Sequence, residues 1–357
     1  MNNPYITSEQ IIGSYAVKYN KLVELINNNY RNRNDTNINI YIDLGNIFKS
    51  ISRFSYINID PFSITASIIN LCAHYRHFFS EYYKCTSKIF IILSDTTDNG
   101  INNRFVPEYY NNIYSNNSEM NNTLKESLNY INMITKYIED MILLVTNFEF
   151  GVIAYDIINK EALNNNKANL IISKDIYNLQ LVSDNMEDDI RVELLYPKKS
   201  NGQDLSFIIS SINLYNFFFE KRKVSIDYNI LKPSLISLIM SLSRTPERNI
   251  KSLYKIPNVI NSINELVSRG LIMNTHSIDI LYICNLLSKL KLINIKDPEQ
   301  ILMRFNSIDI ISQYTMYCEI IHISDRYNGI TNLYDPEAVK EINNKYFKKY
   351  PLDLNVL

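Results

Sequence analysis

The chain has 357 residues, 46% of them hydrophobic, which excludes a disordered tail and suffices for one large or two modest domains. Its 36 Lys and Arg residues balance 37 Asp and Glu residues, so overall charge does not indicate a nucleic-acid clamp, and only local basic patches remain open. No apolar run is long enough to span a membrane, and the N-terminal residues lack the pattern of a secretion signal. The cysteines are scattered and predict free thiols in a reducing compartment: Cys72, Cys85, Cys284 and Cys318.

The residue usage is typical of a strongly AT-rich genome. There is no Trp, there are only 7 Gly, and there are 27 Tyr, while Asn and Ile, whose codons are AT-rich, are abundant. A bacteriophage, a poxvirus or a low-GC bacterium fits this usage. The scarcity of glycine also disfavours loops that cradle phosphate groups through their backbone.

The first half of the chain alternates helical and strand patterns. Residues 8–30 have apolar positions at helical spacing, with Ser8 as a possible N-cap. Residues 38–44 (INIYIDL) alternate and predict a strand. A helix is expected from Pro61 to about residue 84, with Asp60 as its N-cap.

The pattern continues to about residue 200. A buried strand is predicted at 88–94, and an Asn-rich loop at 98–122. The spacing then predicts helices over 123–145 and about 152–163, followed by strands at 168–173 and 190–196. Strands alternating with helices predict βαβ units and an α/β fold with a mainly parallel sheet flanked by helices.

Three acidic residues directly follow predicted strands or lie at their ends: Asp43, Asp95 and Asp175. In a parallel sheet the carboxyl ends of the strands share one rim, where ligands bind. Such carboxylates could hold one or two Mg²⁺ ions, which activate water in phosphodiester hydrolysis. A lone Asp after a strand more commonly caps the following helix, and that reading stays open.

Beyond residue 204 the pattern becomes helical. Apolar residues at helical spacing fall in the segments 232–243, 258–269, 277–291 and 298–304, and no clear strand follows residue 212. We therefore predict three parts: an N-terminal helical extension at 1–37, an α/β domain at 38–212, and a helical C-terminal region at 213–357.

The order of several segments resembles that of the 5′-3′ exonuclease and flap-endonuclease family, within the wider PIN-like nuclease fold. The resemblance covers roughly residues 38–270, and its best single piece is ISKDIYNLQLV. It implies metal ligands at Asp43, Asp95, Glu149 and Asp175, and a helix-hairpin-helix-like segment at 236–266. The segments that carry it are IYIDLGN (40–46), IILSD (91–95), NRFVPEYYNN (103–112), FEFGVIAYDII (148–158), LIISKDIYNLQLV (170–182) and residues 236–266.

The chain departs from the family pattern at several chemical positions. Gly151 and Val152 replace two aspartates of the E-A-D-D helix, and Tyr177 replaces the second aspartate of the D-x-D pair. Thr245 and Arg248 replace two further aspartates. Arg244 replaces a glycine of the family pattern, and Lys255-Ile256-Pro257 replaces the G-x-G hairpin that grips a phosphate. Tyr110 replaces the lysine expected at the entry to the helical arch. Because cations repel Mg²⁺ and uncharged groups bind it more weakly than carboxylates do, the two-metal chemistry is expected to be dismantled.

Basic residues cluster in the helix-hairpin-helix-like segment, where relatives contact the DNA backbone. Arg244, Arg248, Lys251 and Lys255 are therefore candidate nucleic-acid contacts. A salt bridge to Glu247 or to the remaining acids is an equally good reading.

Three functions follow, in order of preference. The first is a catalytically degenerate nuclease-fold protein, reused as a ring, collar or tail-neck component of a phage virion that contacts itself and other virion proteins and needs no cofactor. Phages of the crAss-like group, with AT-rich genomes and multi-ring tails, fit this setting. The second is an Mg²⁺-dependent 5′ nuclease that uses the four residual acids. The third is a non-cutting DNA-binding protein.

Overall fold

The computed structural model describes a large part of the chain, and every structural statement below concerns that part. The described residues are 37–48, 60–83, 85–94, 118–146, 148–162, 168–173, 175–184, 189–200, 203–209, 235–243, 256–272, 279–318, 334–355 and 357. The predicted helix at 8–30 and the larger part of the Asn-rich loop lie outside them.

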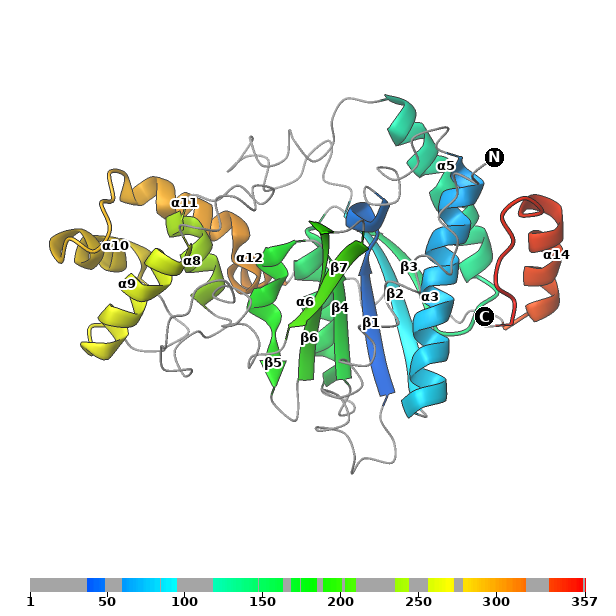
Figure 1. Cartoon of the computed structure of the whole chain (residues 1–357), viewed down its shortest axis with the longest axis horizontal. Helices are drawn as coiled ribbons and strands as arrows, with labels where there is room; N and C mark the ends of the chain where they lie inside the picture. Colours follow the sequence, from blue (N-terminus) through cyan, green and yellow to red (C-terminus); the bar gives the residue numbers. More distant parts are fainter. Residues whose placement is uncertain are drawn as a thin grey trace.

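One sheet of seven strands, counted over the described residues, forms the centre of the molecule (Figure 1). Its strand order is β3-β2-β1-β4-β6-β5, and β7 pairs with β6. The strands β1 to β4 and β6 are parallel, whereas β5 and β7 run antiparallel to β6. The strands are β1 (Asn37–Asp43), β2 (Thr86–Ser94), β3 (Met141–Thr146), β4 (Ala168–Ser173), β5 (Ser183–Asp184), β6 (Asp189–Ser200) and β7 (Gln203–Ile209).

Helices cover both faces of the sheet, which explains why the central strands are nearly continuous apolar runs. On one face, α3 and α5 bury Ile40, Ile42 and Ile91. On the other face, α6 and the helical region bury Tyr41 and Phe90. The helices are α3 (Pro61–Tyr83), α5 (Ser118–Thr135), α6 (Phe150–Ala162), the 3-10 helix η2 (Ile176–Leu181), α8 (Ile236–Ser243), α9 (Ile256–Ser268), α10 (Ile280–Lys289), α11 (Pro298–Ile308), α12 (Ile310–Tyr317) and α14 (Pro336–Tyr346).

The helices α8 to α12 form a helical region beside the β5 edge of the sheet (Figure 1). Three of its helices begin at aspartates whose carboxylates accept a backbone N–H of the first turn, as N-caps do: Asp279, Asp297 and Asp309. The helical region shares one hydrophobic core with α6 and its face of the sheet, so it is packed onto the α/β domain.

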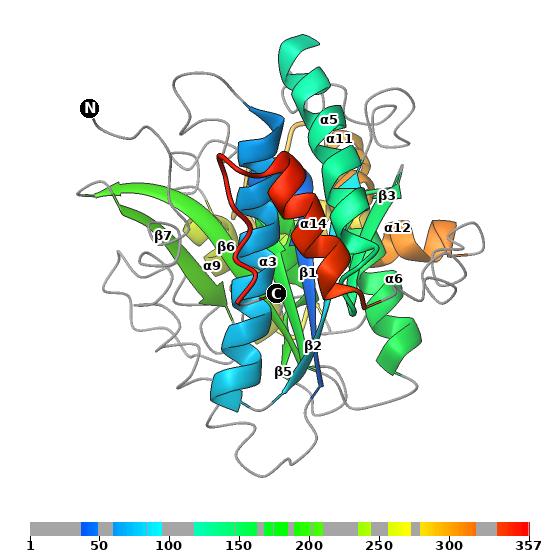
Figure 2. The same ribbon diagram turned by 90° about the vertical axis from the view of Figure 1, so that its right-hand side faces the viewer.

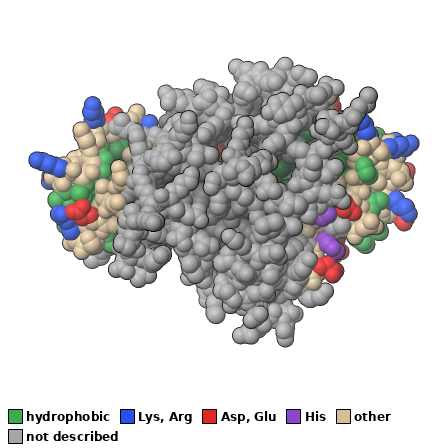
Figure 3. Space-filling model, in the orientation of Figure 1, with side chains coloured by type: hydrophobic (Ala, Val, Ile, Leu, Met, Phe, Trp, Pro, Cys, Tyr) green, Lys and Arg blue, Asp and Glu red, His purple; other side chains and the backbone are tan. Residues whose placement is uncertain are grey.

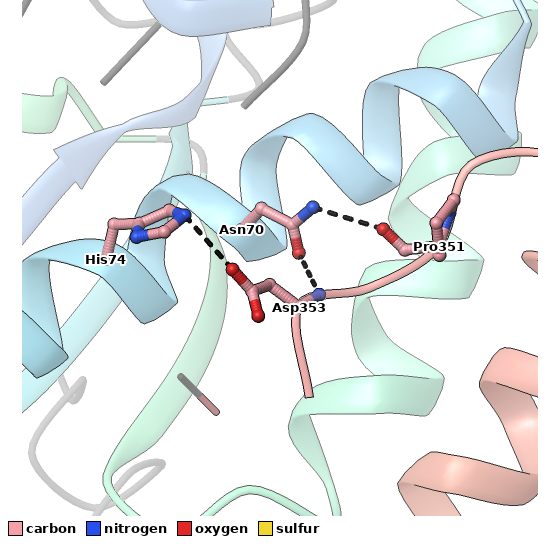
Figure 4. Close-up of polar contacts among 4 residues, drawn as sticks. All are labelled: Asn70, His74, Pro351 and Asp353. Atoms are coloured by element: carbon pink, nitrogen blue, oxygen red, sulfur yellow. Dashed lines mark hydrogen bonds and ion pairs between the residues drawn. The ribbon is translucent and has the colours of Figure 1, made fainter. Parts of the chain in front are cut away.

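The end of the chain returns to the α/β domain on the side away from the helical region. Figure 2 shows α14 lying across α3 and α5, where Phe347 is fully buried and its ring packs edge-on against Phe62. The tail beyond α14 is held by Asn70 on α3, whose amide donates to the Pro351 carbonyl and accepts from the Asp353 N–H (Figure 4). The sequence predicts that this end of the chain belongs to the helical C-terminal region. Instead, α14 and the tail after it pack onto α3 and α5, in the helical layer on the other face of the sheet.

The predicted α/β fold class, with a parallel sheet and a helical region after it, is confirmed. Asp60 caps α3 as expected, since its Oδ1 accepts the Phe62 N–H at 2.9 Å. The predicted helix at 123–145 is wrong at its C-terminal end, because α5 ends at Thr135 and residues 141–146 form strand β3. Asp140, at φ 59°, reverses the chain between them. The strands β5 and β7 were not predicted.

Candidate functional site

The two central strands, β1 and β4, meet at the switch point of the sheet, where the strand order changes direction. Ligand sites of parallel sheets lie outside the carboxyl ends of the strands at such a point. Asp43 is the last residue of β1, and Asp175 follows β4 after one intervening residue. The structure therefore places these two predicted residues at the expected rim.

The Asp43 carboxylate is buried and hydrogen-bonded. Its Oδ1 accepts the Asn46 backbone N–H at 3.1 Å, and its Oδ2 accepts both the Asn46 side-chain amide and the Ser173 hydroxyl, the latter at 2.7 Å. Residues 44–48 form a helical turn directly after β1. Asp43 therefore acts as the N-cap of that turn, which is the alternative that its position after a strand left open.

Ser173, the last residue of β4, links the two acids. Its hydroxyl is fully buried, donates to Asp43 Oδ2, and accepts the Asp175 backbone N–H at 3.1 Å. Asp175 in turn caps η2, because its Oδ1 accepts the Tyr177 N–H at 2.8 Å. The Tyr177 side chain is buried where the family resemblance expects a second aspartate.

Gly151, in the first turn of α6, could carry a side chain only if its neighbours moved. A Cβ at this position would lie 2.5 Å from Asn178 Oδ1 and 2.5 Å from Ile310 Cδ1. Both neighbours are themselves buried. The family resemblance expects a metal-binding aspartate here, but the volume is already filled from η2 and α12.

The remaining predicted site residues are only partly described. Glu149 is half-buried, and its carbonyl accepts the Ile153 N–H at the start of α6. Asp95 lies outside the described residues, immediately after β2. The four candidate nucleic-acid contacts also lie outside them: Arg244, Arg248, Lys251 and Lys255.

Two buried polar residues beside this rim were not predicted as functional. Gln180, on η2, bonds through its amide to the backbone at the corner between α11 and α12. Asp309 occupies that corner and is also buried. The sequence gives Gln180 no role beyond its place in the ISKDIYNLQLV segment, because its partner lies 128 residues further along the chain.

A third buried acid, Asp156, lies on α6 away from the strand ends. Lys160, one turn later, forms an ion pair with it at 2.8 Å. Burial raises the pKa of the Asp156 carboxyl above its ordinary range, and hydrogen bonds and the charge of Lys160 partly oppose this rise. Tyr314 of α12 also opposes the rise of this pKa, and its ring meets that of Tyr155 edge-on. This cluster therefore joins α6 to α12.

The described surface of the helical region carries charges of both signs, which Figure 3 shows interspersed at that end of the molecule. Lys289, Lys291, Lys296 and Arg304 lie among Asp279, Asp297 and Glu299, and Arg269 pairs with Glu265. This part of the surface does not concentrate the positive charge that phosphate-backbone binding uses.

Among the described residues, no three or more acidic, His or Cys side chains gather where they could hold a metal ion. Asp43 already accepts three hydrogen bonds, and Gly151 cannot be replaced by a ligand without displacing its neighbours.

No helix in the described part of the chain has the length and hydropathy needed to cross a membrane.

No protein-family model matches the chain, and no curated protein matches it either. The chain is similar to solved structures of a bacteriophage T5 protein. The T5 D15 protein co-crystallised with metal ions has 10% identity and a TM-score of 0.47, over 85% of this chain and 99% of its own. A T5 D15 flap-endonuclease variant bound to product DNA and metal ions has 12% identity and a TM-score of 0.46, over 85% and 98%. The T5 5′-exonuclease with bound zinc has 11% identity and a TM-score of 0.45, over 87% and 98%.

Proposed function

We propose that this protein has a nuclease-like architecture but does not perform two-metal phosphodiester hydrolysis, and that it serves as a structural component of a phage virion. In that role it forms a ring, collar or tail-neck assembly with copies of itself and contacts other virion proteins. It needs no cofactor for this role.

The packing around Gly151 carries the loss of catalysis in this proposal. A metal ligand at this position requires a side chain, yet even a Cβ would overlap Asn178 and Ile310. The Asp43 carboxylate supports the same conclusion, because it is engaged by Asn46 and Ser173 as a helix cap. Hydrogen bonds of this kind hold the carboxylate in place as part of the fold.

The virion role rests on the composition of the chain. Its AT-rich residue usage fits a phage genome, and its 27 tyrosines suit extensive protein interfaces, in which Tyr is enriched. A fold that loses its metal ligands but keeps its core still presents a stable surface for assembly. A closed ring forms when one surface of a subunit binds a different surface of the next and the rotation between subunits closes.

The test is a cleavage assay combined with a mass measurement. The full-length protein is incubated with Mg²⁺ or Mn²⁺ and a labelled 5′-flap DNA, beside an Asp43→Asn/Asp175→Asn variant purified identically, and light scattering gives the mass of the same samples. We expect equal, background cleavage in both samples and a discrete large oligomer. A monomer would contradict the assembly role.

A second candidate is an Mg²⁺-dependent 5′ nuclease with a reduced ligand set. It is favoured by the joint placement of Asp43 and Asp175 on either side of Ser173 at the switch point of the sheet. Metal-dependent cleavage that the double variant loses would establish this candidate and overturn the first. Binding of the flap DNA without cleavage, weakening steeply with salt, would instead indicate the third function, a non-cutting DNA-binding protein.

A further inference from the structure

The corner between α11 and α12 is bonded to the α/β domain through one side-chain amide. Gln180 Oε1 accepts the Ile310 N–H at 2.9 Å, and Gln180 Nε2 donates to the Ile308 carbonyl at 2.8 Å. The same Nε2 donates to the Tyr177 carbonyl of its own helix η2. Gln180 is buried, so its amide satisfies backbone groups that water does not reach.

Asp309, between the two residues that Gln180 holds, ties the same corner to a third element. Its Oδ2 accepts the Ser312 N–H at 2.9 Å and caps α12, and its Oδ1 accepts the Ser237 hydroxyl of α8 at 2.6 Å. The corner is therefore fixed from two sides by buried hydrogen bonds, by Gln180 from the α/β domain and by Ser237 from within the helical region.

Apolar packing at this corner reaches the rim of the sheet. Ile310, the first residue of α12, is buried and packs against the backbone of Gly151 on α6. The shared core continues from there to Leu179 of η2 and Leu238 of α8. The position of α12 thus decides whether the space beside Gly151 is filled or open.

We infer that the hydrogen bonds of Gln180 hold the α11–α12 corner against η2, a contact that we call the lock. Ile310 therefore stays packed against Gly151, and the helical region unfolds together with the α/β domain as one cooperative unit. This inference concerns the conformational behaviour of the protein. It stands apart from the proposed function, because it holds whether or not the protein cuts DNA.

Native-state hydrogen exchange on the unmodified full-length protein tests the lock first. We expect backbone amides of α11 and α12, including that of Ile310, to exchange through the same opening as those of β1 and β4, with equal dependence on denaturant. A separate opening of α11 and α12, with a smaller free energy and a weaker denaturant dependence, would overturn the inference.

Paired glutamine variants then identify the residue responsible. Gln180→Leu removes the bonds to the corner while retaining an apolar side chain of similar size, and should lower the protection of α11 and α12 by roughly 10- to 100-fold, because buried Ile308 and Ile310 backbone groups lose their partners. Gln313→Leu is the control, because Gln313 is equally buried but donates to the Ser307 carbonyl within the helical region.

The two variants should differ in the cooperativity of unfolding. We expect Gln180→Leu to split thermal unfolding into two transitions, and Gln313→Leu to retain a single transition at lower temperature. A single transition in Gln180→Leu with protection unchanged relative to the wild type would refute the lock. The cleavage assay is unaffected by either result, so the two proposals fail separately.

Discussion

The Ser173 hydroxyl donates a 2.7 Å hydrogen bond to Asp43 Oδ2, joining the carboxyl ends of β4 and β1 at the switch point of the sheet. Replacing Ser173 by Ala leaves a buried carboxylate oxygen with one donor fewer, and should lower the free energy of unfolding by about 1–3 kcal/mol. Urea denaturation measures the change. Ser67→Ala is the control, because the Ser67 hydroxyl donates to the Ser63 carbonyl of its own helix α3. For this variant we expect the free energy of unfolding to change by no more than about 0.5 kcal/mol. Equal effects of the two substitutions would contradict a structural role for Ser173.

Gly151→Ala should destabilise the protein through overlap. The added methyl group would lie 2.5 Å from both Asn178 Oδ1 and Ile310 Cδ1, and forced overpacking of a core costs about 1–3 kcal/mol. Combining it with Ile310→Ala should give less than the sum of the two single effects, because the smaller side chain makes room for the methyl group. Additive losses in urea denaturation would show that Ile310 does not limit this position.

Gly270 is the comparison position for the substitutions at Gly151. It has φ +66° and no atom within 4 Å of an added Cβ, so substitution there strains the backbone alone. Asn tolerates this conformation better than Ala does, so Gly270→Asn should be less destabilising than Gly270→Ala. At Gly151 the order should reverse, because a larger side chain overlaps more. The same order of Ala and Asn at both positions would argue against the packing explanation.

Asp156 should make stability depend on pH in an identifiable way. Its pKa is raised in the folded protein by burial, so the unfolded chain releases this proton more easily. The favourable contribution of the protonated carboxyl is complete below its ordinary pKa near 3.8 and is lost as the pH rises through the folded value. Asp156→Asn cannot ionise, so its stability relative to the wild type should increase from about pH 3.5 upward. A difference independent of pH in urea denaturation would be inconsistent with this shift.

His74 should act in the opposite direction at the contact with the C-terminal tail. Its Nε2 lies 3.5 Å from Asp353 Oδ2, beside the two hydrogen bonds through which Asn70 holds the tail (Figure 4). Burial lowers the pKa of His74 below 6.5, an effect that the Asp353 carboxylate opposes and His77 reinforces. The unfolded chain therefore binds the proton first, and stability should fall as the pH drops below about 6.5.

His74→Gln removes this titration and should flatten the stability profile between about pH 7 and 5. His77→Gln, at an exposed position on the same helix, should leave the larger part of the slope in place. Urea denaturation at a series of pH values separates the two. An unchanged slope in His74→Gln would show that the tail contact does not titrate.

The pattern of the sequence predicts the sheet well where periodicity and length agree. The alternation at 38–44 and the apolar runs at 88–94 and 168–173 match β1, β2 and β4 closely. The helical spacing continues through the first residues of the run MILLVT and so predicts helix there, and only the parallel pairing with β2 identifies the run as strand β3. The strand β7 was missed although Asn201-Gly202, a common hairpin dipeptide, stands between β6 and β7.

The sequence predicts where the candidate site lies, but not the hydrogen bonds and packing contacts within it. Strand ends identify Asp43 and Asp175, because parallel strands bring their carboxyl ends together. The roles of Ser173 and Gln180 depend on partners 130 and 128 residues away. The filled space at Gly151 depends on Ile310, which belongs to a different region of the chain. Such contacts follow from tertiary packing and leave no periodic signal.

The most direct test of the central claim is a Mn²⁺ titration of the full-length protein, followed by the electron paramagnetic resonance signal of the free ion. Asp43→Asn, which keeps the shape of the side chain but removes its charge, serves as the control. If the rim has lost its two-metal centre, the protein and the variant will leave the same free Mn²⁺ signal at every concentration. Uptake of two Mn²⁺ ions per chain that Asp43→Asn abolishes would contradict the account.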